Sequence, residues 1–413
     1  MLVGRVVMLV MLAVASFLPA RAVLAQQAGE PVVGGVALQR TTVDGVTLFY
    51  DPDVDADTVK SASDAIRQGL VEVPEATGLP RFTTPIVAYV MADDARFRLA
   101  LSEVARVPLD LIAEEIGGYT IERDGRMLVF FSAPNVASPA SALFGFAHEL
   151  AHLAVREATQ RRALPQWFNE GYASWISMRV IDRHAPAEAA LGRQLDRAAV
   201  ASALHTRGML PWADLVTRAR FSRAGVDGLV NLAYGQSTLF VDFLVARHGV
   251  PALAKFLTTI GEGQTATPAF TAAFGAFGTE SAAFEATLAT LKTELAPGLY
   301  VVQKAAGDSA LILAVVGGPA RDTAVVELYQ DGEVVRRREL DVDGVGLLVA
   351  ALPASLVSGD HRVSIRVRAP VLGTLELDPT SAVSVHPTSA PQPAPAQLPG
   401  RGSVRLLPVR NAA

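Results

Sequence analysis

The sequence of 413 residues contains no cysteine. Disulfide bonds, a cysteine nucleophile, a zinc site built from cysteine and latency through a cysteine switch are therefore excluded. The chain also lacks positive net charge: its formal net charge is -5, which gives no electrostatic footprint for nucleic acid. It has no phosphate-binding loop and no internal repeat. Half of its residues are apolar, enough for a sizeable core, and it is too long for one average domain.

Long apolar runs are absent beyond the N-terminus, where the chain begins with a targeting pattern. Residues 6–18 are apolar after a positive charge at Arg5, and small residues surround Ala25. This pattern predicts a secretory signal peptide, residues 1–25. An uncleaved anchor is the alternative, but the run is short for a membrane span and Pro19 follows it. We therefore expect an exported protein, periplasmic or secreted, with no membrane span after cleavage.

The most informative segment is Phe144 to His152, which contains the pattern His-Glu-x-x-His. In a helix, His148 and His152 leave the same face, where two neutral ring nitrogens can bind zinc. Glu149 lies beside them, where it can take a proton from a zinc-activated water. The surrounding residues are strongly apolar, and buried polar groups need partners, which a metal ion supplies. A surface helix that carries two histidines by chance is the alternative.

A single acid, Glu170, stands in the apolar segment Leu164 to Trp175. This segment predicts a second helix with Pro165 in its first turn. A carboxylate in such surroundings is unfavourable unless it is paired. Zinc held by two histidines needs one further protein ligand to leave an open catalytic position, and Glu170 meets both requirements. The alternative is a glutamate that the dipole of its helix stabilises near the helix N-terminus.

His148 to His152, followed by Trp167 to Gly171, resembles the gluzincin zinc metallopeptidases, in particular the peptidase MA-like domain. That domain is related to thermolysin-type and aminopeptidase-type enzymes. The resemblance extends over residues 36–297. It implies that the chain is a zinc metallopeptidase, a hydrolase that cleaves peptide bonds in a peptide or protein substrate, with Glu149 as general base. The residues implied to bind one zinc ion are His148, His152 and Glu170.

Asn231 to Ser237 resembles the helix of this family that carries Ala-Tyr-x-x-Ser. The resemblance implies that Tyr234 is catalytic and donates a hydrogen bond to the oxyanion of the tetrahedral intermediate; a packing tyrosine is the alternative. Two departures from the family patterns exist. Ser174 stands where thermolysin-type enzymes often have an aspartate that orients a zinc-bound histidine. Met127 to Ala133 contains no acid to bind a substrate amine, which argues against a strict aminopeptidase.

Hydrophobic periodicity predicts an α+β fold, in which strands and the helix of His148 and His152 precede an all-α subdomain. The resemblance to gluzincins implies that this fold is thermolysin-like, with a mixed sheet ahead of the zinc helix. Resemblance to gluzincins implies that Leu128 to Ser132 is the edge strand with which an extended substrate pairs. Gly117 and Gly118 fit a turn. The elements expected before the zinc helix are a hairpin at 41–50, a helix at 57–76 and strands at 85–91 and 127–131. Those expected after Glu170 are helices at 186–204, 212–219, 228–247, 250–260 and 280–295.

From Gly298 onward the pattern changes to short strands separated by turn residues. It predicts a small all-β, immunoglobulin-like sandwich over residues 298–386, whose expected role is binding an envelope partner or spacing. Residues 387–413 are rich in proline, alanine and glutamine and predict a disordered tail. The expected organisation is a signal peptide (1–25), a gluzincin-like peptidase domain (36–297), the β-sandwich (298–386) and the tail (387–413).

Two functions of other classes remain open. One is a catalytically idle zinc-containing protein, or a peptide-binding module of the cell envelope, which grips a partner strand without cleaving it. An idle site has no need of Glu149, which argues against this alternative. The other is a structural envelope protein whose histidine pair is accidental. Bound zinc would exclude the second, and cleavage that a chelator inhibits would exclude the first.

Overall fold

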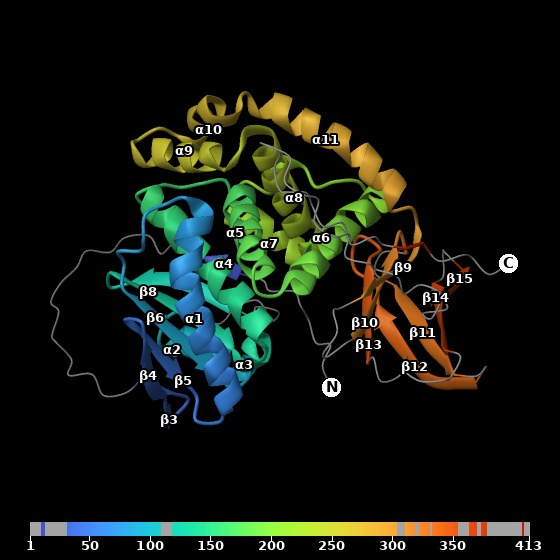
Figure 1. Cartoon of the computed structure of the whole chain (residues 1–413), viewed down its shortest axis with the longest axis horizontal. Helices are drawn as coiled ribbons and strands as arrows, with labels where there is room; N and C mark the ends of the chain where they lie inside the picture. Colours follow the sequence, from blue (N-terminus) through green and yellow to red (C-terminus); the bar gives the residue numbers. More distant parts are fainter. Residues whose placement is uncertain are drawn as a thin grey trace. The chain divides into compact units, whose positions relative to one another are not determined.

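The structure, a computed structural model, describes residues 10–12, 31–108, 118–303, 310–318, 322–330, 333–353, 363–369, 373–377 and 407–408 (Figure 1). Contacts between residues divide the chain into two units. The first unit comprises residues 1–163, 173–184 and 250–269. The second comprises residues 164–172, 185–249 and 270–413.

The first unit is built on a mixed, six-stranded sheet in the order β1-β7-β8-β6-β5-β4. Strands β5, β6 and β8 run parallel to one another, whereas β7 is antiparallel to β8 and β4 to β5. The hairpin turns at Asp44 and Gly45, as predicted, and both residues have positive φ. The strands of this sheet are β1 (Val10–Leu12), β4 (Gln39–Val43), β5 (Val46–Tyr50), β6 (Ile86–Met91), β7 (Gly118–Arg123) and β8 (Arg126–Ser132).

Strand β8 is not the edge of the sheet, so the expectation for Leu128 to Ser132 is wrong. β8 pairs with β6 on one side and with β7 on the other. Strand β7, which the sequence did not predict, lies outside β8, and β1 pairs in parallel along its outer side. Gly118 opens β7 and is therefore a strand residue, not a turn residue. Gly117 lies outside the described residues.

Helices α1 (Ala56–Thr77) and α4 (Pro139–Ala158) pack closely against each other. Helix α1 begins at Asp55, whose carboxylate accepts a hydrogen bond from the Thr58 backbone N–H at 2.8 Å. It ends at Gly78, which adopts the left-handed conformation with φ 67°. The first unit also contains β2 (Val32–Val33), β3 (Val36–Ala37), α2 (Asp94–Glu103), α3 (Ala133–Val136) and α9 (Val250–Gly261).

The helices of the second unit surround an aromatic cluster centred on Trp167. The centroids of the Trp212, Phe240 and Phe277 rings lie 5.3, 5.1 and 5.7 Å from that of Trp167. Aromatic pairs at such distances add stability beyond the area that they bury. The remaining helices of the chain are α5 (Gln166–Asp182), α6 (Pro186–Thr206), the 3-10 helix η2 (Trp212–Asp214), α7 (Arg218–Val226), α8 (Val230–His248), α10 (Ala266–Phe274) and α11 (Phe277–Glu294). The sequence did not predict α2, α3 or α10. The single helix expected at 212–219 is wrong: the chain forms η2 there, and α7 begins at Arg218.

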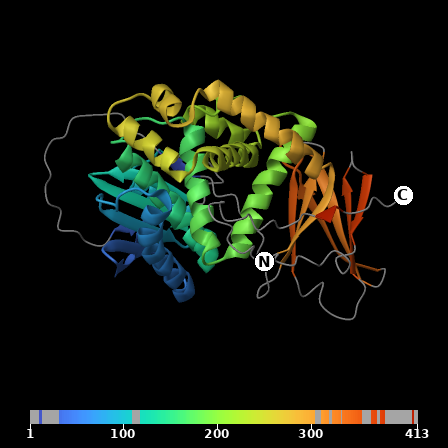
Figure 2. The same ribbon diagram turned by 45° about the horizontal axis from the view of Figure 1, so that its top comes forward.

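Beyond α11 the second unit contains two four-stranded sheets, ordered β13-β10-β9-β16 and β12-β11-β14-β15. Figure 2 shows helix α6 beside the first of these sheets, and α6 contacts both β9 and β10. Only residues 407–408 of the predicted tail are described, as the short strand β16. The strands are β9 (Gly298–Gln303), β10 (Ala310–Val316), β11 (Thr323–Gln330), β12 (Glu333–Asp341), β13 (Leu348–Pro353), β14 (Val363–Ala369), β15 (Gly373–Leu377) and β16 (Leu407–Pro408).

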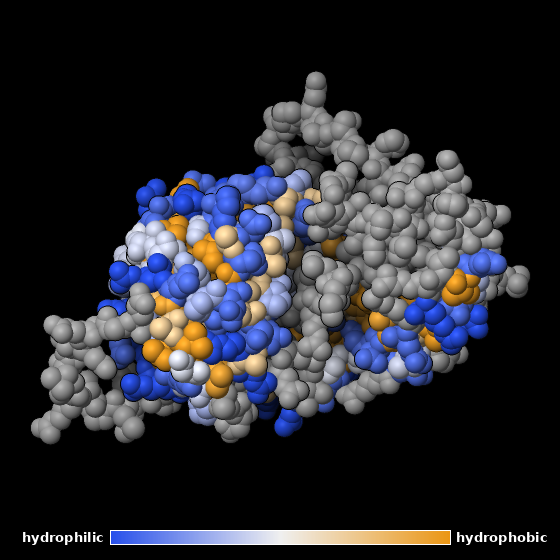
Figure 3. Space-filling model, turned by 90° about the horizontal axis from the view of Figure 1, so that it is seen from below, coloured by the Kyte–Doolittle hydropathy of each residue, from blue (hydrophilic) through white to orange (hydrophobic). Residues whose placement is uncertain are grey.

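The surface mixes polar and apolar residues. On the face drawn in Figure 3, the coloured hydrophobic residues lie scattered among hydrophilic ones. Among the residues that the structure describes, the exposed large hydrophobic ones are valines at separate places in the sequence, such as Val71, Val216 and Val334. Within the described part of the chain, every helix is too short or too polar to span a membrane.

Candidate metal centre

Helix α4 carries the His-Glu-x-x-His pattern, and its start is defined by a capping box. The Ser138 hydroxyl accepts a hydrogen bond from the Ser141 backbone N–H, and the Ser141 side chain accepts one from the Ser138 backbone N–H, both at 3.2 Å. Pro139 occupies the first turn, where its missing N–H is not needed. The predicted apolar positions are buried, so the helix is a core element rather than a surface helix. These positions are Leu143, Phe146, Ala147, Leu150 and Ala151.

The two histidines of α4 lie on one face, as their spacing predicts. His148 and His152 are each 1% exposed. Their Nε2 atoms are 3.1 Å apart, and their rings meet at an interplanar angle of 79°. Both Nε2 atoms therefore face the same small volume, which is the arrangement that a shared metal ion requires.

Helix α5 brings a carboxylate to this volume. It begins at Gln166, directly after Pro165, and buries Trp167 and Phe168 in the aromatic cluster. Glu170 is fully buried, and its Oε1 accepts a hydrogen bond from Gln166 Nε2 at 2.7 Å. This bond holds the carboxylate within the first turns of α5. The alternative for Glu170, stabilisation by the helix dipole alone, does not explain why its carboxylate is buried.

His148, His152 and Glu170 form a group whose ligand atoms all lie within 4.8 Å of one another. In the described ranges of the chain, no other three histidine, cysteine or acidic residues form such a group. Two imidazole nitrogens and one carboxylate oxygen are the donors of catalytic zinc sites that keep an open position. Ligand atoms around tetrahedral zinc lie about 3.4 Å apart for zinc–ligand distances of about 2.1 Å, close to the separation of the Nε2 atoms. The three residues therefore fit a zinc ion.

Glu149 is fully buried on the same helix, and strand β7 passes beside it. A β carbon built on Gly118 would lie 3.3 Å from Glu149 Oε1 and 2.8 Å from the Phe131 ring. Further along β7, Glu122 Oε2 accepts a hydrogen bond from Arg156 Nε of α4 at 2.6 Å. Arg161 and Arg156 lower the pKa of Glu122, because both donate hydrogen bonds to its charged form. Strand β7 is thus fastened alongside helix α4.

Sequence reasoning missed this neighbour of Glu149. A signal was present: Tyr119 and Ile121 alternate with polar residues ahead of the turn at Asp124 and Gly125. Such alternation before an Asp-Gly turn predicts the first strand of a hairpin. Because Gly118 fits a turn in the sequence, strand β7, which it opens, was not predicted.

Tyr234 lies in α8 and is half-buried. Its ring packs edge-on against Phe221, with ring centroids 5.2 Å apart. Two residues further on, the buried Gln236 side chain accepts a hydrogen bond from the Leu210 N–H at 3.0 Å and donates one to the Leu210 carbonyl at 2.9 Å. Gln236 therefore fastens a loop to α8, whereas the catalytic role of Tyr234 stays a prediction.

Helix α6 carries a second unusual carboxyl group, Asp196. Burial raises the pKa of Asp196 to about 7, although part of the residue remains exposed. The Asp196 backbone lies against α8, since a β carbon on Gly235 would be 2.9 Å from the Asp196 carbonyl oxygen. The sequence did not single out this residue, because a helical aspartate carries no pattern that reveals its burial.

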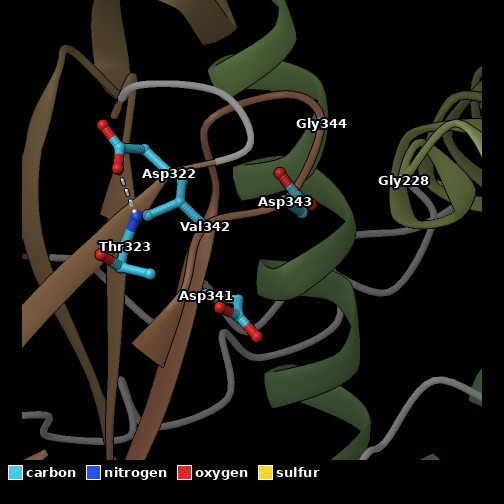
Figure 4. A pocket seen from close by; sticks show the side chains of 7 residues that line it. All are labelled: Gly228, Asp322, Thr323, Asp341, Val342, Asp343 and Gly344. Atoms are coloured by element: carbon cyan, nitrogen blue, oxygen red, sulfur yellow. Dashed lines mark hydrogen bonds between the residues drawn. The ribbon is translucent and has the colours of Figure 1, made fainter. Parts of the chain in front are cut away.

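A pocket of about 350 Å³ lies elsewhere in the second unit (Figure 4). It is lined by residues of the α7–α8 turn and of the β-sheet region. None of the predicted site residues lines it. The lining residues are Gly228, Asp322, Thr323, Asp341, Val342, Asp343 and Gly344.

Comparison with known protein families gives a match to the part of the chain that contains the predicted metal ligands. Residues 133–286 match the family model of the Peptidase MA superfamily. The matched range contains both predicted motifs, so the resemblance noted for His148 to His152 and Trp167 to Gly171 is confirmed. A superfamily of this kind supports the prediction of a metallopeptidase, a hydrolase. No curated protein matches the chain significantly.

Two similar solved structures are yeast LTA4 hydrolase in complex with bestatin and Legionella pneumophila aminopeptidase A in complex with aspartic acid. The first is 10% identical, with a TM-score of 0.35 over 62% of this chain. The second is 15% identical, with a TM-score of 0.36 over 79% of this chain. The chain spans 37% of the length of each of these two structures.

Proposed function

We propose that the protein is a zinc-dependent metallopeptidase that hydrolyses peptide bonds. The observation that carries this proposal is the buried group of His148, His152 and Glu170, whose ligand atoms lie within 4.8 Å of one another. Burying three ionisable side chains together is unfavourable unless they share a partner such as a metal ion. The Peptidase MA superfamily match over residues 133–286 supports peptide hydrolysis as the reaction.

In the proposed reaction the metal ligands, Glu149 and Tyr234 have separate roles. When bound to the three ligands, zinc would acidify a water molecule and polarise the scissile carbonyl group. Glu149 accepts the proton of the attacking water and later returns it to the leaving amine. Tyr234 donates a hydrogen bond to the oxyanion of the tetrahedral intermediate. Gly118 leaves the Glu149 carboxylate unobstructed on the side of β7.

We also propose that the chain is exported and that an extended substrate pairs with strand β7 after the signal peptide has been removed. Val10–Leu12, within the predicted signal peptide, form β1 and pair with Gly118 to Thr120 of β7. Cleavage after Ala25 would remove β1 and leave the outer backbone groups of β7 unpaired beside Glu149. An extended peptide would then pair with β7, in place of the β8 pairing expected at first. N-terminal sequencing of the exported protein would test the cleavage; an intact N-terminus would contradict it.

The C-terminal region is proposed to be an immunoglobulin-like sandwich over residues 298–386 that docks an envelope partner. The four-stranded sheet β12-β11-β14-β15 and the three strands β13, β10 and β9 of the other sheet lie in this range and support an all-β region. The proposal predicts that an affinity-tagged chain, cross-linked in the periplasm or on secretion, retains an envelope protein that a chain ending at residue 297 does not.

A peptide-library digest followed by mass spectrometry tests the peptidase proposal. Wild-type protein is incubated with the library, with and without o-phenanthroline, and again after excess zinc is restored. We expect cleavage that the chelator abolishes and zinc restores. Glu149→Gln is the matched control, because it retains the three ligands and removes the base. Cleavage that survives the chelator, or that Glu149→Gln retains in full, would overturn the mechanism. Bound zinc with no cleavage of any peptide would favour the idle, peptide-binding alternative.

A further inference from the structure

A loop of the β-sheet region contacts the helices of the second unit at three places. The loop, residues 342–347, connects β12 to β13. The Val345 carbonyl oxygen accepts hydrogen bonds from the Ser202 hydroxyl at 2.8 Å and from the Thr206 hydroxyl at 2.9 Å, both on α6. The Gly344 N–H donates to the Gly228 carbonyl at 2.9 Å, in the turn before α8. Ser202 and Val345 are fully buried, so this contact is part of the core.

Asp343 shapes this loop and also reaches α8. Its Oδ1 accepts hydrogen bonds from the backbone N–H groups of Val345 at 3.0 Å and Leu347 at 2.8 Å. Its Oδ2 accepts a hydrogen bond from Asn231 Nδ2, in the first turn of α8, at 3.3 Å. Burial raises the pKa of Asp343, while the two backbone N–H groups oppose that rise. One carboxylate therefore holds the loop in shape and ties it to α8.

At Gly344 the loop approaches the turn before α8 so closely that no room is left for a side chain. A β carbon on Gly344 would lie 2.7 Å from the Asp227 carbonyl oxygen, 2.8 Å from the Gly228 carbonyl oxygen and 2.8 Å from Leu229 Cδ2. Figure 4 shows Gly344 and Asp343 in the loop, and Gly228 in the turn that precedes α8. Two of these three neighbours are backbone atoms, which cannot move aside as the end of a flexible side chain can. Any side chain at position 344 must therefore displace the loop from the start of α8.

Helix α8 in turn contacts the segment that carries the third predicted ligand. Ser237 lies about two turns along α8 from Asn231. A β carbon on Gly171 would lie 2.4 Å from the Ser237 carbonyl oxygen and 2.6 Å from the Ser237 carbonyl carbon. Gly171 directly follows Glu170 in α5, so the backbone of α8 sets where the Glu170 backbone lies. A displacement of α8 is therefore transmitted to Glu170.

We propose that the 342–347 loop is a positioning device for the metal centre. It fixes α8 through Asp343 and Gly344, and α8 fixes Glu170 through the contact between Ser237 and Gly171. Ligand orientation by surrounding residues typically accounts for about 10- to 100-fold in metal affinity. The inference rests on the proposed function for the identity of the metal, zinc. It makes the C-terminal β-sheet region a part of the metal centre's support.

The experiment measures zinc affinity by competition with a chromophoric chelator, using the full-length chain. We expect Gly344→Ala to weaken zinc binding several-fold, up to about 10-fold, the lower end of the range for groups that contact a ligand directly, because Gly344 acts on Glu170 only through α8. Gly298→Ala is the matched control in the same region, because its nearest non-neighbouring atom would lie 3.8 Å away. This control is expected to bind zinc as wild type does. Cobalt substituted for zinc provides a spectroscopic readout, with an altered visible absorption spectrum in Gly344→Ala only.

Asn231→Ala is a milder second variant, since it removes one hydrogen bond to Asp343 and leaves the loop backbone unchanged. It keeps the test decisive if Gly344→Ala fails to fold, and we expect a several-fold loss of zinc affinity. Hydrogen exchange of residues 342–347 reports whether the loop has loosened. One outcome is a folded variant that exchanges the amide hydrogens of residues 342–347 faster than wild type and still binds zinc as tightly. That result would overturn the inference and leave the proposed function intact. A wild-type chain that binds no zinc would instead overturn the proposed function and this inference with it.

Discussion

Gly118 and Glu149 meet where strand β7 passes helix α4: a β carbon on Gly118 would lie 3.3 Å from Glu149 Oε1. The same β carbon would lie 2.8 Å from Cε1 of Phe131, whose ring packs on Phe146 with centroids 4.6 Å apart. A methyl group here thus crowds the predicted base and its aromatic support together.

Gly118→Ala is expected to lower turnover while zinc content stays at the wild-type level, because Glu149 moves and the ligands do not. Overpacking of a full core typically lowers the free energy of unfolding by about 1–3 kcal/mol. Steady-state kinetics, zinc analysis and urea unfolding measure the three quantities. Gly278→Ala is the control, since no atom would lie within 4 Å of its β carbon. Unchanged turnover in Gly118→Ala would mean that β7 does not constrain the base.

Glu149→Gln should retain zinc and lose about 10²- to 10⁴-fold in turnover, the range that general acid–base catalysis contributes. The reason is that glutamine preserves the shape of the side chain but cannot accept the proton of the attacking water. Turnover and zinc content are measured on the same preparation. A variant that cleaves peptides at the wild-type rate would remove Glu149 from the mechanism.

Tyr234→Phe should lower turnover by about 10²- to 10³-fold with little change in KM, if the phenol donates to the oxyanion. Phenylalanine keeps the edge-on packing against Phe221, so the fold should be unaffected. Phe221→Leu is a useful companion, because it disturbs the packing and leaves the hydroxyl in place. Equal turnover in Tyr234→Phe and wild type would assign the tyrosine to packing alone.

Asp196 predicts a pH dependence of stability with a definite sign. Its pKa rises from 3.8 to about 7 in the folded state. Between these values the folded chain holds a proton that the unfolded chain has lost, so the free energy of unfolding falls as pH rises through this window. Asp196→Asn stays neutral, so above about pH 7 its free energy of unfolding should exceed that of wild type. The difference between the two free energies should shrink as the pH falls towards 3.8. Urea unfolding at several pH values measures it.

Asp53→Asn is the control for this prediction, because Asp53 is exposed. It removes a charge at the surface, so an effect that both variants share would come from the loss of a charge and not from the burial of Asp196. If Asp196→Asn and wild type lose stability in parallel as the pH rises, another group carries the effect.

Local patterns predicted the elements that carry the site, because those patterns are set by neighbours in the chain. Helix α4 follows from the spacing of its apolar residues, and the turn of the β4–β5 hairpin from Asp44 and Gly45. Strand order is not local. Nothing in the residues of β8 records that β7 lies between it and the edge, because β7 pairs with β8 while the preceding strand β6 pairs with its other side.

The residues of the site also fall into those that local sequence predicts and those that depend on the fold. The pairing of His148 with His152 follows from helical spacing alone. The approach of Glu170 to them depends on how α5 packs, so the sequence indicated it only indirectly, through a lone acid in an apolar segment and through family resemblance. Gly118, Gly171 and Gly344 carry no side chain that could mark them. Their importance lies in what a β carbon would strike, which is a property of the fold and not of the sequence pattern.

The account depends on zinc held by His148, His152 and Glu170, and zinc analysis of purified chains tests it directly. Wild type and Glu170→Ala are equilibrated at the same low free-zinc concentration and analysed by inductively coupled plasma mass spectrometry. We predict about one zinc per wild-type chain and a large loss in Glu170→Ala, because catalytic zinc needs its third protein ligand. Full zinc occupancy in Glu170→Ala, or none in wild type, would contradict the account.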